Sequence, residues 1–403
     1  AQSLAVALAT GAAYLRALYA AGIDPDHGTG RIAFTWRADA HFFEQIAALR
    51  ALRITWNRIA EASGSSGRSM HVHVLTSERV VSRRDPWVNV LRGTTTAFAG
   101  LVGGADAVSC ASFDRALGQS TPTGRRIARN TPIVLGEESH LHRVVDPAGG
   151  SWFVENLTAA LALKAWEEFQ QIEREGGAVE ALRSGSLRER VDAAWESKRA
   201  KIATRREALT GVSEFAQLDE RRPDVEPFPD PGEGVHHESE RLQPWPVRRL
   251  GDDFEELRDV SDAANADGIE PRAFLVTLGP LVEHNVRANW IRNVLAAGGI
   301  AARAAGDLDD TEAAAKAFAD SGLDFAVICG TDARYAEQAA DVARALRREG
   351  AALVWLAGRP GDHEDAWREA GVDRFVHMGV DVVEVLREAL GHLIESTREE
   401  TER

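Results

Sequence analysis

Residues 84–110 read RDPWVNVLRGTTTAFAGLVGGADAVSC and contain one complete helix-to-strand unit. Asp85 and Pro86 predict the start of a helix, because a carboxylate can cap the free N–H groups of a first turn and proline is tolerated at the first helical position. The glycine pair at 103–104 predicts the end of that helix. The apolar run at 105–110 that follows predicts a strand.

The same alternation of strand and helix extends toward the N-terminus. Short apolar runs rich in strand-favouring residues lie at 31–36 (RIAFTW) and 69–75 (SMHVHVL). Between them, the segment 42–59 places its apolar residues on one helical stripe. These residues are Phe42, Ile46, Leu49, Leu52 and Trp56. Units of this kind build parallel sheets with helices packed outside, so this half of the chain predicts an α/β fold.

Downstream, the sequence changes character twice. Residues 151–206 carry a helical stripe, whereas 211–253 is rich in proline, glycine and charge and predicts an extended linker. Five apolar runs with little alternation follow, as expected of parallel strands buried on both faces. They are RAFLVTLG (272–279), IAARAAG (300–306), DFAVICG (324–330), ALVWLAG (352–358) and RFVHMG (374–379). This pattern predicts a doubly wound domain with ligand space outside the carboxyl ends of its strands.

Composition narrows the class of protein. The 403 residues, 44% of them apolar, can form two packed cores, and the net charge of −15 argues against a nucleic-acid partner. Cys110 and Cys329 lie in apolar runs and predict buried thiols in a reducing compartment. Residues 1–22 predict an amphipathic soluble helix, and no uninterrupted apolar stretch approaches the length of a membrane span. We therefore expect a cytoplasmic protein, and the excess of Arg over Lys suggests a bacterial one.

Three segments together carry a family resemblance. Residues 126–152 read RIARNTPIVLGEESHLHRVVDPAGGSW, and they follow the runs at 31–36 and 84–109. The chain resembles the methylmalonyl-CoA mutase family, whose members rearrange acyl-CoA thioesters by radical chemistry with adenosylcobalamin. The resemblance extends through the linker into the last domain and covers essentially the whole chain.

The resemblance implies an architecture of three parts. Residues 1–150 would be the C-terminal half of a (β/α)8 TIM-type barrel, 151–260 a helical segment with the extended linker, and 261–403 a flavodoxin-like, doubly wound domain of the cobalamin-binding type. Only three or four strands can be counted before residue 150, yet such a barrel closes with eight. The sequence therefore predicts that the chain is the C-terminal part of a longer polypeptide, with its earlier strands lost or supplied by another chain; a family member would carry them at its N-terminus.

The family holds cobalamin with a loop that reads D-x-H-x-x-G after the first strand of that domain. There the His binds cobalt, the Asp orients the imidazole and the Gly lets the corrin approach the backbone. Aligned on Gly279, this chain has Leu281, Glu283 and Val286 at the three positions. The resemblance thus implies that no residue of this chain ligates the cofactor.

Two further features of residues 261–403 bear on this comparison. His284 lies one position from the ligand, but a shifted register would put Val282 and Arg287 at the Asp and Gly positions, so a polar residue at a loop or helix start is the better interpretation. Residues 329–331 and 357–359 match the segments that line the family's channel for the cofactor tail. In this chain they are equally consistent with simple strand-end turns.

The substrate strand of the family reads R-T-H-S-Q-T-S-G, and its His hydrogen-bonds the thioester carbonyl. Here the run is HVHVLTSE at 71–78, in which His73 matches the catalytic His, and Thr76 and Ser77 also match. The Arg, Gln and Gly of the pattern are replaced, by His71, Leu75 and Glu78. His73 is therefore the candidate catalytic residue, with a hydrogen-bonded core or strand-end histidine as the alternative.

Several histidine groups invite a metal interpretation. His71 and His73 share one strand face by the two-residue period. The other groups are His140 and His142 with Glu137 and Glu138, and the pair His236 and His237. None has the spacing of a known metal site, so we predict no metal site. The glycine pair at 298–299 follows a helical pattern and predicts a helix end rather than a phosphate cradle.

The sequence leaves three functions open. The first is a small, non-catalytic subunit that forms a heterodimer with a homologous large subunit, which would bind adenosylcobalamin and interconvert methylmalonyl-CoA and succinyl-CoA. The second is a divergent catalytic acyl-CoA mutase that binds cobalamin without a histidine lower ligand. The third is a stand-alone regulatory or scaffold module. A half-barrel would expose strand edges, so we also expect low solubility of this chain expressed alone.

Overall fold

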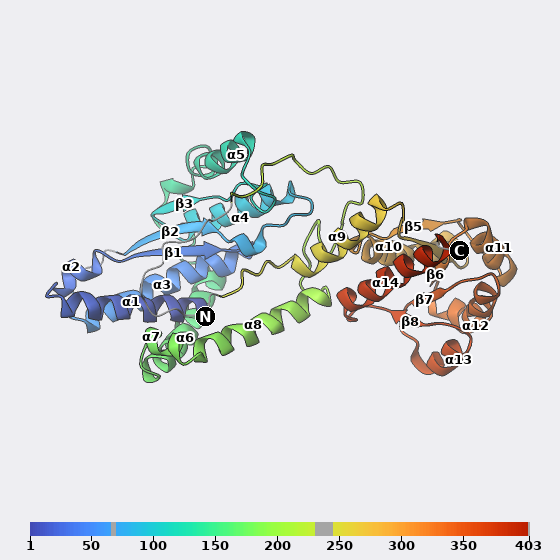
Figure 1. Cartoon of the computed structure of the whole chain (residues 1–403). Coiled ribbons are helices and arrows are strands. Elements are labelled where there is room, and N and C mark those ends of the chain that lie inside the picture. The colour runs from blue at the N-terminus through green and yellow to red at the C-terminus, as the bar shows by residue number, and fades with distance from the viewer. Residues whose placement is uncertain (66–69, 230–244, 402–403) are drawn as a thin grey trace. The chain divides into compact units, whose positions relative to one another are not determined.

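The computed structural model describes residues 1–65, 70–229 and 245–401, and the chain divides into two compact units. The first unit comprises Ala1–Ser197 and Arg222–Arg249, and the second comprises Lys198–Arg221 and Leu250–Arg403. Each unit has its own parallel sheet, and each is described below by itself (Figure 1).

The sheet of the first unit has three parallel strands in the order β1-β2-β3. They are β1 (Ala33–Ala38), β2 (His71–Thr76) and β3 (Ala107–Ser109). The register sets Thr35 beside His73 and His73 beside Ala107. All three strands predicted from the apolar runs in this half of the chain are confirmed. The predicted α/β class with parallel sheets is confirmed as well.

The described part of the first unit also contains a series of helices. They are α1 (Gln2–Ala20), α2 (Pro25–Thr29), α3 (Phe42–Ala62), α4 (Val88–Val102), α5 (Pro122–Ile133), α6 (Trp152–Arg174), α7 (Ala178–Arg183) and α8 (Ser186–Ala203), which continues into the second unit. Short π and 3-10 segments lie at η1 (Glu78–Val80), η2 (Val134–Glu138) and η3 (Leu141–Arg143). Val72 and Val74 of β2 join Leu49, Leu52 and Trp56 of the predicted stripe of α3 in one buried core, whereas Ile46 belongs to a second, smaller core. Figure 1 shows α1 and α3 together on one side of the strands.

The first helix has the length and composition of a membrane span, with a mean hydropathy of 1.3 over its most apolar window. A core helix passes the same test, and the structure buries one stripe of α1. The buried residues are Leu4, Ala5, Leu8, Ala9, Ala12 and Leu15. A β-carbon at Gly11 would lie 2.7 Å from the indole of Trp56, so the glycine lets α1 approach α3 closely.

Two local predictions were wrong at their boundaries. α4 begins at Val88, three residues after Asp85, which takes a left-handed conformation (φ 43°) in a turn closed by the Val88 N–H donating to the Asp85 carbonyl at 3.0 Å. The long helical stretch after 151 is broken into three helices. Gly177 and Gly185, both at positive φ, lie at the two breaks.

The predicted linker has little regular structure where the structure describes it. Apart from an isolated bridge between Thr210 and Glu214, its described residues form no helix or strand before α9 begins at Asp252. It is nevertheless not detached from the rest of the chain. The Gln119 N–H donates to the carbonyl of Glu226 at 2.8 Å within the first unit.

The second unit contains all five strands that the apolar runs predicted. They are β4 (Arg272–Thr277), β5 (Ala301–Ala304), β6 (Phe325–Cys329), β7 (Leu353–Ala357) and β8 (Arg374–Val376). Every pair is parallel, and the order is β5-β4-β6-β7-β8. In chain order this is 2-1-3-4-5, the order of a doubly wound sheet, and the connections change direction beside β4.

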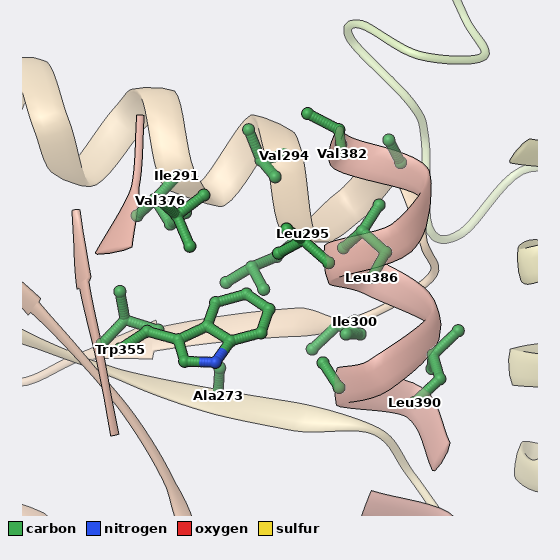
Figure 2. Close-up of a cluster of buried hydrophobic side chains, with 14 of the residues drawn as sticks. Ala273, Ile291, Val294, Leu295, Ile300, Trp355, Val376, Val382, Leu386 and Leu390 are labelled. Atoms are coloured by element: carbon green, nitrogen blue, oxygen red, sulfur yellow. The ribbon is translucent and has the colours of Figure 1, made fainter. Parts of the chain in front are cut away.

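Helices cover both faces of this sheet, and their residues make two separate cores. They are α9 (Asp252–Ala266), α10 (Leu281–Ala297), α11 (Thr311–Ser321), α12 (Asp332–Arg348), α13 (Glu364–Glu369) and α14 (Val382–Thr401), with a 3-10 turn η4 (Gly361–His363). Alternate residues of one strand point to opposite cores: Ala273 lies in the core under α10 and α14 (Figure 2), whereas Phe274 lies in the core under α11 and α12. The helix end predicted at 298–299 is confirmed, with Gly298 as the cap of α10.

Candidate functional site

The crevice at the carboxyl ends of β4 and β6 is where a doubly wound sheet binds ligands. Only Leu278, Gly279 and Pro280 separate the end of β4 from the first residue of α10. This turn is held on both sides, because the Leu278 N–H donates to the Cys329 carbonyl and the Gly279 N–H donates to the Leu308 carbonyl, both at 2.8 Å. Gly279 is at φ +76°, which favours glycine. The segment that corresponds to the family's cofactor loop is therefore the first part of a helix.

The three positions of the family loop lie on the first two turns of α10. Leu281 and Val286 are exposed, at 60% and 78% of their surface. Glu283 accepts a hydrogen bond of 2.7 Å from the Nε of Arg334, and this ion pair covers Gly279. Residues two apart on a helix point to different sides, so an Asp at 281 and an imidazole at 283 would not face one another while the helix starts here.

His284 points to a different part of the second unit. Its side chain is buried, and its Nε2 lies 3.1 Å from a carboxylate oxygen of Asp307, in the segment between β5 and α11. Its Nδ1 has no hydrogen-bond partner among the described residues. The histidine thus joins the start of α10 to a neighbouring loop, which agrees with its interpretation as a polar residue at a helix start.

Tyr335 of α12 lies at the carboxyl ends of the paired strands β6 and β7. It is fully buried, and its hydroxyl accepts a hydrogen bond of 3.0 Å from the Gly330 N–H and donates one of 2.9 Å to the Ala357 carbonyl. Burial raises the pKa of this phenol far above its ordinary value, so it stays protonated. The Gly330 N–H after β6 and the Ala357 carbonyl at the end of β7 therefore already have a hydrogen-bond partner within the protein.

Arg287 of α10 covers the same strand ends from the other side. Its Nη1 donates to the Gly330 carbonyl at 2.8 Å, and its guanidinium lies 4.8 Å from the centre of the Tyr335 ring. Its Nη2 pairs with Asp332. Sequence analysis considered Arg287 only as a misplaced glycine position and did not single out Tyr335. Neither residue belongs to a motif that would have marked it.

The glycines after β6 and β7 make room for these two side chains. A β-carbon at Gly358 would lie 3.1 Å from the Tyr335 ring and 3.3 Å from Arg287, and one at Gly330 would lie 3.4 Å from the ring. The crevice lacks an imidazole in position to ligate cobalt, and its strand ends are occupied by protein groups. The described residues therefore do not fit a corrin with its nucleotide tail.

Both cysteines are poor nucleophiles in this fold. Burial raises the pKa of the Cys329 thiol to about 12 and that of the Cys110 thiol to about 11. Both are free thiols, as predicted, although Cys110 is half-buried rather than fully buried. They offer no thiolate near neutral pH.

His73 lies on the face of the first sheet that is turned away from the helices. It is half-buried, and its Nε2 lies 2.9 Å from the Ser109 hydroxyl on the neighbouring strand. The other two residues that match the family strand have structural contacts instead. Thr76 is buried against Thr96 of α4, and Ser77 caps the 3-10 turn η1. Ser109 could not be recognised from sequence, because only the register of β2 and β3 brings it beside His73.

The remaining histidine groups do not assemble metal sites. His71 shares the sheet face of His73, but its Nδ1 lies 4.0 Å from Asp106, which Arg53 also contacts. His142 bonds through Nδ1 to the Gly136 carbonyl. Across the described ranges, no three side chains of His, Cys, Asp or Glu gather as metal ligands would. The pair His236 and His237 lies outside the described residues.

Comparison with known proteins gives a consistent family. A family profile described as methylmalonyl-CoA mutase matches residues 1–283. The chain is 45% identical, over 98% of its length, to a methylmalonyl-CoA mutase small subunit of Streptomyces virginiae, and 37% identical, over 96%, to one of Propionibacterium freudenreichii subsp. shermanii. It spans 62% and 60% of those two relatives. A methylmalonyl-CoA mutase of Cereibacter sphaeroides is 37% identical over 53% of this chain and 31% of that relative.

Proposed function

The chain belongs to the methylmalonyl-CoA mutase family, and on this premise we propose that it is a small, non-catalytic subunit of an adenosylcobalamin-dependent isomerase. Its partner in a heterodimer would be a homologous large subunit that binds the cofactor and interconverts methylmalonyl-CoA and succinyl-CoA. In this proposal residues 1–150 contribute barrel strands, 151–260 form the helical segment and linker, and 261–403 form a flavodoxin-like domain of the cobalamin-binding type. The free cysteines fit a bacterial cytoplasm.

The observation that carries this proposal is the start of α10. Leu281, Glu283 and Val286 replace the three residues that would orient the imidazole, hold cobalt and admit the corrin, in that order, and they lie on a helix instead of a loop. In this proposal the second unit keeps the architecture of the family's cofactor domain but lacks the side chains that would bind the cofactor. The role left to it is to support a partner through protein contacts, as obligate subunits do.

Adenosylcobalamin supplies the proposed test. Titration of the purified chain should leave the absorption spectrum of the cofactor unchanged, whereas the complex co-expressed with a homologous large subunit should bind it stoichiometrically. Spectral changes with the chain alone would refute the non-catalytic role. Failure to co-purify with any cobalamin-binding large subunit would instead favour a stand-alone scaffold.

Substitutions in the assembled enzyme give a second test. Leu281→Ala, Glu283→Ala and Val286→Ala should each leave turnover within about twofold, because the proposal gives these side chains no contact with cofactor or substrate. A loss of more than tenfold in any of them would contradict it. An unrelated exposed position of the same unit, Met378→Ala, is the matched control.

One observation favours a second candidate, the divergent catalytic mutase. His73 is on the open face of the sheet with Ser109 as its hydrogen-bond partner, a position from which an imidazole can donate to a thioester carbonyl. His73→Asn in the complex distinguishes the two. Under the proposed function turnover persists, whereas under the second candidate it falls by about 10²–10⁴-fold, the usual contribution of such a group. Ser109→Ala is the companion variant.

A further inference from the structure

We propose that Arg287 and Tyr335 form a plug that closes the ligand crevice of the second unit, so that these two side chains exclude a nucleotide-bearing corrin independently of the missing loop residues. The ligand class in this inference rests on the proposed function. The plug itself rests only on contacts within the second unit.

Tyr335 fills the crevice with all its hydrogen bonds made. Its hydroxyl bonds to the Gly330 N–H and the Ala357 carbonyl, which are the groups at the ends of β6 and β7 that a ligand would otherwise reach. A ligand that displaced the ring would have to replace both bonds and the buried ring contacts. The crevice is therefore closed by a fully satisfied side chain.

Arg287 packs against the face of the Tyr335 ring. Its guanidinium lies over the Tyr335 ring at 4.8 Å and is anchored to the Gly330 carbonyl and to Asp332. These contacts join α10 to the loop after β6. Movement of Tyr335 toward solvent would require the arginine to release its anchors first.

The plug gives a physical reason for the glycine at position 358. In a ligand-binding sheet, glycines at strand ends let the ligand approach the backbone. Here the space above Gly358 is taken by the Tyr335 ring at 3.1 Å and by Arg287 at 3.3 Å from a β-carbon built on that glycine. Gly358 has no positive φ that would demand glycine for another reason. The plug thus predicts that the need for glycine disappears when the plug is removed.

A double-mutant cycle tests this coupling without any ligand. Gly358→Ala in the otherwise unchanged chain should lower the thermal midpoint of the second unit by about 2–4 °C or more. In the Arg287→Ala/Tyr335→Ala background, the same substitution should lower it by less than half as much. If the double background does not fold, Arg287→Ala alone serves, with a smaller but measurable reduction. Equal losses in all backgrounds would overturn the plug.

Ligand binding tests the exclusion directly. The loop variant Leu281→Asp/Glu283→His/Val286→Gly restores the three family residues and, through its glycine, weakens the start of α10. The combined variant adds Arg287→Ala and Tyr335→Ala. In equilibrium dialysis of the full chain against hydroxocobalamin, the combined variant should bind at least tenfold more tightly than the loop variant, with circular dichroism confirming that both are folded.

The binding results distinguish the plug from the proposed function. If the folded combined variant binds hydroxocobalamin no more tightly than the loop variant, the plug is not the barrier to binding. If the unmodified chain binds hydroxocobalamin, the proposed function fails. In that case the double-mutant cycle still tests the plug, because it measures stability without any ligand.

Discussion

Tyr335 shows at the scale of one residue how a buried hydroxyl stabilises the second unit. Tyr335→Phe keeps the ring but leaves the buried Gly330 N–H and Ala357 carbonyl without this partner. We expect the free energy of unfolding to fall by about 1–3 kcal/mol, measured by urea denaturation. Tyr14→Phe is the control, since Tyr14 is 60% exposed and its replacement should change stability by less than about 0.5 kcal/mol. Equal effects in the two variants would contradict the account.

Asp114 holds a charge inside the first unit. Its side chain is fully buried, and it accepts hydrogen bonds from the Ser112 hydroxyl at 2.5 Å and from the Thr121 hydroxyl and N–H at 2.6 and 2.9 Å. Burial by itself raises the pKa of the carboxyl, but the hydrogen bonds outweigh it and the pKa lies below its ordinary value. A β-carbon at Gly124 would lie 2.7 Å from this carboxylate, so the glycine leaves room for it.

A pH series tests this carboxylate. Because its pKa is lower in the folded than in the unfolded protein, ionised Asp114 stabilises fully above about pH 4, and the contribution is lost as the pH falls through the folded pKa. Asp114→Asn should therefore be about 1–3 kcal/mol less stable than the unchanged chain at pH 7. The difference should shrink at pH 3.5. Urea denaturation at both pH values measures it, and a constant difference would show that the charge is not involved.

At the scale of the element, the start of α10 determines where the residues at the positions of the family loop lie. Pro280 precedes the helix and Leu281 is its first residue, so the positions of the family loop become helical residues, with Leu281 and Val286 exposed and Glu283 paired with Arg334. The arrangement follows from the short turn after β4, which Leu308 and Cys329 hold in place through backbone hydrogen bonds.

The exposure of Leu281 gives a prediction for this helix. Leu281→Asp adds a carboxylate to the first turn, where the helix dipole favours negative charge, so stability should stay the same or rise by up to about 1 kcal/mol. Leu278→Asp, three residues earlier, should unfold the second unit, because Leu278 is fully buried and an unpaired charge there has no partner. Thermal melts compare the two. A large loss for Leu281→Asp would mean that its side chain is not solvent-facing.

At the scale of the whole molecule, each compact unit carries its own core. Trp56 lies in the core of the first unit and Trp355 in that of the second, and both are only 1% exposed. Each Trp→Ala substitution should lower the stability of its own unit by about 3–5 kcal/mol. Hydrogen exchange measured peptide by peptide should show faster exchange only in the substituted unit. Loss of protection in both units from either substitution would indicate one cooperative structure.

The amino-acid order alone predicts the elements correctly, and alignment with the family motif predicts that the cofactor residues are replaced. All eight strands form where apolar runs predicted them, and α3 buries the predicted stripe, because the periods of helix and strand are local properties of the chain. The shared face of His71 and His73 followed from the same two-residue period. The replacement of Leu281, Glu283 and Val286 needed only an alignment with the family motif.

Tertiary structure decides what fills the crevice and what surrounds His73. Arg287 meets Gly330 across 43 positions and Ser109 meets His73 across 36, and no local pattern encodes such pairs. The later start of α4 has the same origin: a local rule favoured a helix start at Asp85, but the chain turns through a left-handed conformation there before α4 begins at Val88. Side chains distant in sequence meet only after the sheet has set the register and the helices have packed, so the closed crevice becomes visible only in the folded chain.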